Sequence, residues 1–237
     1  MTPPQLVTLS LAQRLDSVLA RLKAALASAG RPEDDATLVA VSKRHPAALI
    51  REAAAAGQFV FGENYAQEMV AKMEELSDVD GIAFHYIGRL QTNKAKLVTG
   101  NAALLHAVDR PKVLRAISRH AVDRSLRQEL LFEVHLSHED SKAGCAPEEL
   151  PALMETALEL PGVRPRGLMT MPPFFADPEE SRPYYSALRA LREDMASRFG
   201  LTDFDQLSMG MSHDFEVAVA EGATLVRVGT AIFGPRI

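Results

Sequence analysis

The sequence predicts a single (β/α)8 barrel. Eight short apolar, strand-like runs alternate with helical patterns along the 237 residues, and this alternation favours parallel strands joined by helices. One α/β barrel commonly occupies a chain of this length. No Ser/Gly-rich linker and no internal repeat divides the sequence, so we expect residues 1–237 to form one domain.

An amphipathic helix is expected to precede the barrel. Leucine and valine recur at three- and four-residue steps from about residue 5 to residue 28. Gly30 and Pro32 then end the helical pattern. Residues 1–30 should therefore form an N-terminal helix that packs on the barrel.

The eight strand-like runs are short and apolar. They lie at 37–42, 59–62, 84–88, 103–108, 129–136, 166–171, 205–209 and 224–229. Helical patterns fall between them at 46–56, 66–76, 92–98, 111–123, 147–159, 178–199 and 212–221. Several of these helices begin with proline, whose missing N–H costs nothing in the first turn.

Composition and charge exclude several classes of function. A net charge of −5 argues against sequence-independent binding to nucleic acid, and no apolar stretch approaches the ~18 residues of a membrane span. The first residues lack the pattern of a signal peptide, and the single cysteine, Cys145, suits a reducing cytoplasm. We expect Cys145 to be an unremarkable thiol. The spacing of the histidines predicts no metal site, and His85 and His106 are expected to pack or hydrogen-bond.

Chemistry is expected at the carboxyl ends of the strands, where barrels carry their active sites. Lys43 follows the first predicted strand, on the same face as Val39 and Val41, and Asn64 follows the second. A lysine in a partly desolvated site loses its proton readily and can form imines. A solvated surface lysine is the alternative, and these residues alone leave both interpretations open.

The last two strands end in residues suited to hold a phosphate. Ser208 and Ser212 surround the end of the seventh strand, and Gly229 and Thr230 end the eighth. Barrels often bind phosphate after these two strands, through hydroxyls and backbone amides. An imine-forming amine opposite such a cradle is what a protein needs to hold pyridoxal 5'-phosphate (PLP).

Several charged residues in these segments need partners. Arg227 interrupts the last apolar run, so it should make either a structural ion pair or a ligand contact. Glu133 and His135 share one face of the fifth strand, where internal polar packing is expected. Asp214 and Glu216 lie in the helical turn after Ser212 and would repel a phosphate unless they point outward.

Six motifs in chain order run from about residue 37 to the end of the sequence. They are VAVSK at 39–43, FGENYAQE at 61–68, HYIGRLQTNK at 85–94, GLMTMPP at 167–173, LSMGMS at 207–212 and VRVGTAIFG at 226–234. In these motifs the sequence resembles the YggS/PROSC family of pyridoxal phosphate homeostasis proteins. The departures are Phe84, where the family often has tryptophan, and Glu133 and His135, in a strand that usually carries amides.

The resemblance implies a barrel similar to the N-terminal domain of alanine racemase, with PLP bound to Lys43 as an internal aldimine. Asn64 would help to position the cofactor. The residues implied around its phosphate are Ser208, Ser212, Gly229 and Thr230. Arg227 would face the pyridine nitrogen and keep it unprotonated, which makes the ring a poorer electron sink.

The resemblance also implies that the protein carries or buffers PLP and takes part in vitamin B6 and amino-acid homeostasis. We therefore expect a cytoplasmic monomer that contacts PLP-dependent apoenzymes transiently and has no catalytic residues. Racemisation needs a second acid or base, which alanine racemases take from an additional domain of a partner subunit. We expect no such domain after the eight βα units of this sequence. The alternatives are a PLP-dependent racemase or lyase and a Schiff-base aldolase acting on a sugar phosphate.

Overall fold

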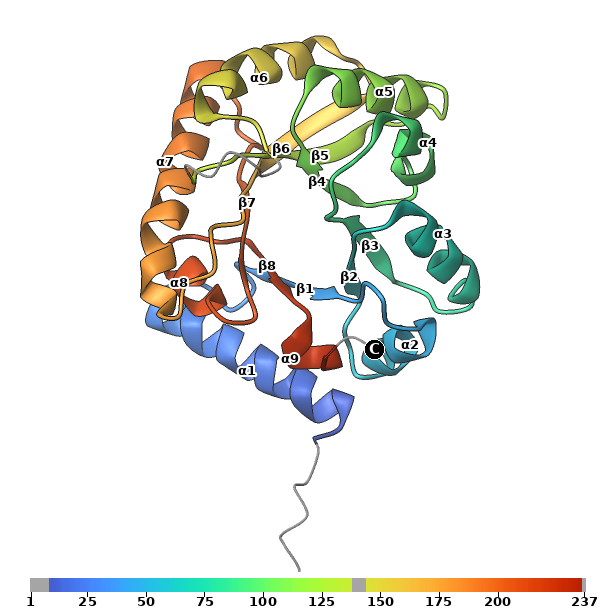
Figure 1. Ribbon diagram of the computed structural model, residues 1–237, viewed down its shortest axis with the longest axis vertical. Coiled ribbons are helices and arrows are strands. Elements are labelled where there is room, and N and C mark those ends of the chain that lie inside the picture. The colour runs from blue at the N-terminus through green and yellow to red at the C-terminus, as the bar shows by residue number, and fades with distance from the viewer. Residues whose placement is uncertain (1–8, 138–143, 236–237) are drawn as a thin grey trace, which may run out of the picture.

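Eight parallel strands close into a barrel in the order in which they follow one another along the chain. The computed structural model describes residues 9–137 and 144–235, and helices surround the ring of strands (Figure 1). The predicted barrel is thereby confirmed. None of the helices in the described part of the chain is long and apolar enough to cross a membrane.

The strands occupy the apolar runs of the sequence. They are β1 (Thr37–Val41), β2 (Val60–Glu63), β3 (Ala83–Tyr86), β4 (Leu104–Val108), β5 (Gln128–Glu133), β6 (Val163–Met169), β7 (Gln206–Met211) and β8 (Leu225–Val228). Neighbouring strands pair in parallel, and β8 pairs with β1 to close the ring.

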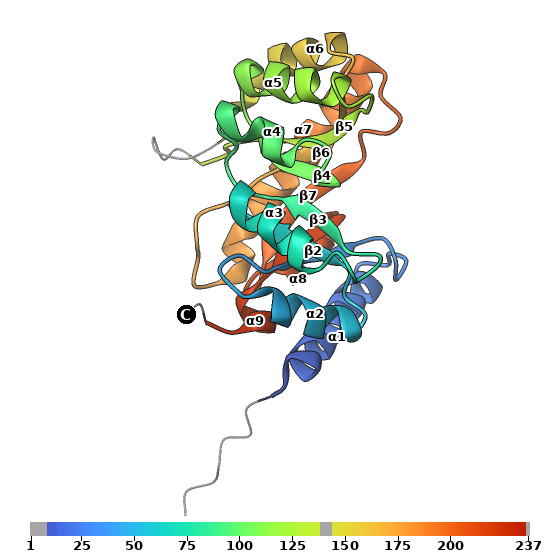
Figure 2. The same ribbon diagram turned by 90° about the vertical axis from the view of Figure 1, so that its right-hand side faces the viewer.

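The helices lie outside the strands. They are α1 (Leu11–Ser28), α2 (Ala47–Ala55), α3 (Ala66–Glu75), α4 (Ala95–Val98), α5 (Pro111–Val122), α6 (Leu150–Glu159), α7 (Arg182–Phe199), α8 (Phe215–Ala220) and α9 (Thr230–Phe233). Short 3-10 turns precede three of them, at η1 (Thr92–Lys94), η2 (Pro147–Glu149) and η3 (Pro178–Ser181). Figure 2 shows α2, α3, α4 and α5 arranged along one side of the barrel.

Several predicted boundaries differ from those observed. The prediction for the fifth strand ran to residue 136, but β5 ends at Glu133, and Val134 makes only an isolated bridge to Cys145. The prediction missed α9, because four residues are too few to show a helical period. Cys145 is buried, and this burial raises the pKa of its thiol to about 12, so the thiol is protonated near neutral pH.

Helix α1 packs against α2, α8 and α9 on the outside of the barrel. Ser10 caps it, because the Ser10 hydroxyl accepts from the Gln13 N–H while the Gln13 side chain accepts from the Ser10 N–H. Its buried residues recur with the helical period and are Leu11, Leu15, Val18, Leu22 and Leu26. The start of the predicted helix at residue 5 lies outside the described residues.

Alternate residues of each strand face opposite sides of the barrel wall. One set packs against the helices in the larger hydrophobic core, which includes Leu38, Ala40 and Phe61. The other set fills the barrel interior and is represented by Val39, Leu104, Leu131, Met169 and Leu225. Because both sets are buried, the strand runs are apolar almost throughout.

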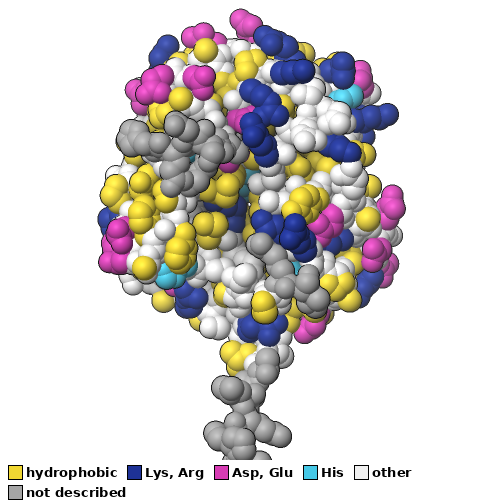
Figure 3. All heavy atoms as spheres, viewed as in Figure 1, with side chains coloured by type: hydrophobic (Ala, Val, Ile, Leu, Met, Phe, Trp, Pro, Cys, Tyr) yellow, Lys and Arg dark blue, Asp and Glu magenta, His cyan; other side chains and the backbone are white. Residues whose placement is uncertain are grey.

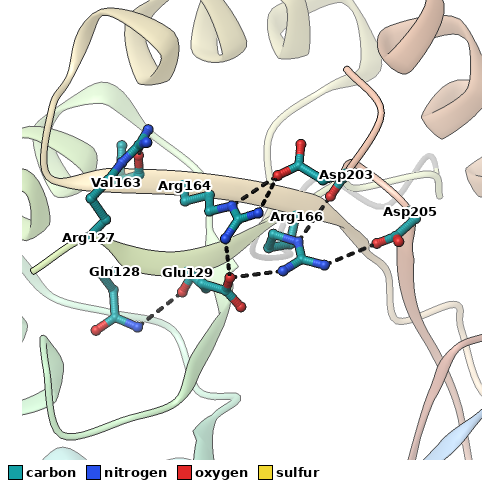
Figure 4. A network of polar contacts seen from close by, with 8 residues as sticks. All are labelled: Arg127, Gln128, Glu129, Val163, Arg164, Arg166, Asp203 and Asp205. Atoms are coloured by element: carbon teal, nitrogen blue, oxygen red, sulfur yellow. Dashed lines mark hydrogen bonds and ion pairs between the residues drawn. The ribbon is translucent and has the colours of Figure 1, made fainter.

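An ion-pair network joins β5, β6 and the segment before β7 at the amino-terminal end of these strands (Figure 4). Glu129 accepts from Arg166 at 2.8 Å and from Arg164 at 3.3 Å, while Arg164 also contacts Asp203 at 2.7 Å. Each half-exposed pair contributes roughly 0–1 kcal/mol. The network therefore adds modestly to the stability of the barrel at the amino-terminal ends of the strands, on the side opposite to the expected site.

Two buried histidines form a polar cluster in the barrel interior. His85 Nδ1 lies 2.9 Å from His106 Nε2, and His106 Nδ1 lies 2.8 Å from the Ser208 hydroxyl. Burial lowers the pKa of His85 to about 4 and that of His106 well below its usual value. Both rings are therefore neutral near neutral pH and act as hydrogen-bonding groups.

Protonation of His85 should destabilise the fold as the pH falls. Because its pKa drops from 6.5 to about 4 on folding, the unfolded chain takes up the proton first. The free energy of unfolding should fall by up to about 3 kcal/mol between about pH 6.5 and about pH 4. Urea denaturation of the wild type and His85→Gln at several pH values measures this effect. The variant should lose less stability across this range, with His213→Gln as a control at an exposed histidine. Equal losses would contradict the assignment.

Candidate functional site

A cavity of about 450 Å³ opens at the carboxyl ends of the strands. The predicted site residues that line it are Lys43, Asn64, Ser212, Arg227, Gly229 and Thr230. Figure 3 looks onto this face, where basic side chains gather around a central hollow. The cavity falls within the range of small-molecule and cofactor sites.

Lys43 lies two residues after the end of β1, and a buried polar network holds the backbone of Ser42 before it. The Ser42 hydroxyl donates to Glu63 Oε1 at 2.7 Å, and Lys72 Nζ donates to the same oxygen at 2.6 Å. Lys72 Nζ also donates to the Ser42 carbonyl at 2.8 Å, so the hydroxyl and the carbonyl of Ser42 are both held by hydrogen bonds. Lys43 itself is half-buried and lines the cavity, which favours a site residue over a solvated lysine.

Hydroxyls and a backbone amide gather where β7 and β8 end. The Ser212 hydroxyl lies 3.4 Å from the Gly229 N–H and 3.3 Å from the Thr230 hydroxyl. A Cβ on Gly229 would lie 3.2 Å from the Val41 carbonyl oxygen, so glycine permits the close approach of β8 to β1. These groups form a donor-rich corner that suits an anion.

The two acidic residues after Ser212 point away from this corner. Asp214 Oδ2 accepts from the Tyr185 hydroxyl at 2.6 Å, and Oδ1 accepts from the Met211 N–H at 2.7 Å. Glu216 lies on the outer surface, where it contacts Arg21 at 2.6 Å. Neither carboxylate lines the cavity, so the expected repulsion of a phosphate is avoided.

Arg227 is buried in β8 and is held by uncharged acceptors. It donates to the Ser208 hydroxyl at 2.6 Å and to the Thr170 carbonyl at 3.0 Å. Within residues 9–137 and 144–235 the guanidinium makes no ion pair. Because Arg227 also lines the cavity, this arrangement favours a ligand contact over a structural ion pair.

Ser208 lies behind Arg227 and is not among the residues that line the cavity. It is fully buried, and it connects Arg227 to the histidine cluster through His106. The reason is the length of β7, which continues to Met211 and so leaves Ser208 about three strand steps below the mouth. Ser208 thus supports Arg227 from below the cavity, and its contact with a phosphate, implied by the resemblance, stays a prediction.

Sequence reasoning missed Arg89 as a lining residue and treated Glu133 as internal packing. Arg89 follows β3 within the motif at 85–94, and its place just after a strand could have identified it as a site residue.

Asn64 and Glu133 each have a buried oxygen, Oδ1 and Oε2, without a hydrogen-bond partner among the described residues. His135 lies beyond β5 and bonds the Ser137 hydroxyl at 2.7 Å, away from the lining residues.

The residues around the cavity fit PLP. They offer an amine for the aldehyde carbon, hydroxyls and an amide for the phosphate, and an arginine for the ring. The unpartnered Asn64 and Glu133 oxygens show that the wall still has unused capacity for hydrogen bonds. Glu133 is the one acidic side chain among the described lining residues, so the cavity is mainly cationic and suits an anionic ligand.

Solved structures that resemble this chain include a PLP-bound protein. PipY of Synechococcus elongatus, solved with PLP bound, matches with a TM-score of 0.84 and 36% identity, covering 95% of this chain and 100% of that one. Alanine racemase of Clostridium difficile matches with a TM-score of 0.72 but only 13% identity, covering 94% of this chain and 56% of the racemase. The second likeness shows a shared fold.

Sequence comparisons agree. Residues 14–236 match the family described as alanine racemase, N-terminal domain. A pyridoxal phosphate homeostasis protein of Aquifex aeolicus is 46% identical over 224 residues, which are 94% of this chain and 97% of that protein. Another from Pseudomonas aeruginosa is 43% identical over 227 residues, 96% of each chain. This chain belongs to the YggS/PROSC family of pyridoxal phosphate homeostasis proteins, within the alanine racemase N-terminal domain group.

Proposed function

We propose that this chain binds PLP covalently through Lys43 and carries or buffers it, as part of vitamin B6 and amino-acid homeostasis. The observation that carries this proposal is the convergence of Lys43, Arg227 and the donor-rich corner at Ser212 and Thr230 on one cavity. The PLP bound in the similar PipY structure and the likeness to pyridoxal phosphate homeostasis proteins of two bacteria support the same function.

Each lining residue has a distinct role in this proposal. Lys43 would hold the cofactor through its amine, which can condense with an aldehyde. Ser212, Gly229 and Thr230 donate hydrogen bonds to the phosphate, while Asn64 orients the cofactor. PLP supplies an electron sink for carbanions when its ring nitrogen is protonated. Arg227 would oppose that protonation, because its guanidinium carries hydrogen-bond donors and a positive charge.

The surroundings of Arg227 support a restrained cofactor. Its acceptors, Ser208 and the Thr170 carbonyl, are neutral, so they do not cancel the positive charge that Arg227 brings to the cavity. A carrier benefits from this restraint, because a strongly activated cofactor would consume the amino acids that it meets. The protein should therefore lack efficient turnover, in contrast to a PLP-dependent racemase or lyase.

The mouth of the cavity offers a route for exchange with other proteins. Met171 and Phe174 line the cavity and are 45% and 78% exposed. Exposed apolar side chains at the rim suit transient contact with PLP-dependent apoenzymes that receive the cofactor. We further propose that the protein works as a monomer, since the residues proposed to contact the cofactor all come from one chain. We also place it in the cytoplasm, which its single cysteine suits.

The first prediction concerns the covalent link. The purified protein should be yellow, and borohydride reduction should place the pyridoxyl group on Lys43, as detected by peptide mass spectrometry. Lys43→Ala should lose the adduct. An adduct on Lys94 would contradict the assignment of the amine, and a colourless protein would favour the aldolase alternative.

The phosphate contacts predict a difference between two ligands. Ser212→Ala with Thr230→Val should weaken binding of PLP on the order of a hundredfold or more, because each hydrogen bond to a charged oxygen contributes about 1.5–3 kcal/mol. Binding of unphosphorylated pyridoxal should change much less. Spectrophotometric titration of both ligands measures this, with Ser77→Ala plus Thr156→Val as a matched surface control. Equal weakening for the two ligands would show that these hydroxyls do not hold phosphate.

Restraint by Arg227 predicts negligible turnover. Alanine and serine, incubated with the PLP-loaded protein in deuterated water, should exchange their Cα protons far more slowly than in an enzyme. Nuclear magnetic resonance of the recovered amino acids measures the rate. Exchange at about 1 s⁻¹ or faster, an ordinary enzyme rate, would establish the racemase or lyase alternative instead.

A further inference from the structure

Glu133 presents an unpartnered carboxyl oxygen at the wall of the cavity. It is the last residue of β5 and is only 3% exposed, and its Oε2 atom has no hydrogen-bond partner in the described part of the chain. Its backbone carbonyl accepts from the Cys145 N–H at 2.9 Å, which fixes the end of the strand. Native proteins rarely bury such an oxygen without a use for it.

The barrel places Glu133 across the cavity from Lys43. β5 lies opposite β1 in a ring of eight strands that follow one another in order, and both residues line the same cavity. A ligand attached to Lys43 is therefore faced by the Glu133 carboxyl from the other side.

The charged groups around Glu133 come from three other elements. Burial raises the pKa of the Glu133 carboxyl the most, and Asp109, just after β4, raises it further. Arg227 and Arg89 lower it, and the pKa is about 7. Asp109 is itself paired with Arg110 and lies 3.6 Å from Arg89. Both protonation states of Glu133 are therefore accessible near neutral pH.

We propose that Glu133 takes up a proton from solvent when PLP enters the cavity and then donates a hydrogen bond to the bound cofactor. This inference rests on the proposed function. An ionised carboxylate in this desolvated wall would repel the anionic cofactor, whereas a protonated one becomes a donor. Binding and protonation are thus linked, and a rise in pH weakens binding through Glu133.

The pH dependence of Lys43 has the opposite sign, and a matched variant separates the two effects. Imine formation needs the neutral amine, so Lys43 favours binding at higher pH. Glu133→Gln keeps Lys43 and retains an amide donor at position 133, but it cannot ionise. The ratio of the dissociation constants of wild type and Glu133→Gln therefore reports Glu133 alone.

The experiment is equilibrium dialysis of PLP against both proteins between about pH 6 and about pH 8. With a carboxyl pKa of about 7, the dissociation constant of the wild type should rise about tenfold relative to that of Glu133→Gln. Calorimetry in two buffers of different ionisation enthalpy should show close to one additional proton taken up by the wild type near pH 8. Glu148→Gln, which removes an exposed carboxylate, should behave like the wild type.

The outcomes separate this inference from the proposed function. If both proteins bind PLP with the same pH dependence and proton uptake, the role of Glu133 is overturned while PLP binding stands. If neither protein binds PLP, the proposed function fails and this inference fails with it.

A second measurement covers the case in which Glu133→Gln does not fold. Wild-type protein with ¹³C-labelled glutamate should show one carboxyl resonance that remains protonated near pH 8 only after PLP is added. A set of glutamate carboxyls that are all ionised in the loaded protein would overturn the proposal.

Discussion

The pairing of the first strand with the last is the constraint on which the site depends. In this ladder Val39 lies opposite Arg227 and Ala40 lies opposite Val228, so the ends of β1 and β8 reach the same edge. Gly229 then packs against Val41, and Lys43 lines the same cavity as Gly229, although most of the chain separates them in sequence. The close approach at Gly229 leaves no room for a larger residue without a shift of β1. Closure of the barrel by this pairing therefore brings the residues after β1 and β8 to one cavity.

Two buried polar clusters hold the backbone before Lys43 and the side chain of Arg227 in place. At the end of β1, the carboxylate of Glu63 accepts hydrogen bonds from the Ser42 hydroxyl and from Lys72. Burial raises the pKa of the Glu63 carboxyl, and the Lys72 ammonium opposes that rise. Below β8, Ser208 connects Arg227 with His106. The first cluster is ionic and the second is uncharged. Since buried hydrogen-bonding groups are costly to leave unsatisfied, both clusters resist rotation of the residues that they hold.

The uncharged support of Arg227 has a chemical consequence. A carboxylate partner would neutralise the positive charge of the Arg227 guanidinium. Its actual acceptors, a hydroxyl and a backbone carbonyl, are uncharged, so the positive charge can still attract an anion in the cavity. The cavity is thus cationic on the side of β8 and has its one described acidic side chain, Glu133, on the side of β5. This asymmetry fits an anionic cofactor held in one orientation.

The sequence by itself determined the barrel, since strand and helix periods repeat along the chain, and it placed Lys43, Ser212 and Thr230 at strand ends. It could not set the depth of a residue within the barrel, because depth depends on strand length and register. That is why Ser208 lies behind Arg227, and why Glu133 belongs to the cavity wall. These positions follow from contacts between strands remote in sequence, and only the closed tertiary structure decides them.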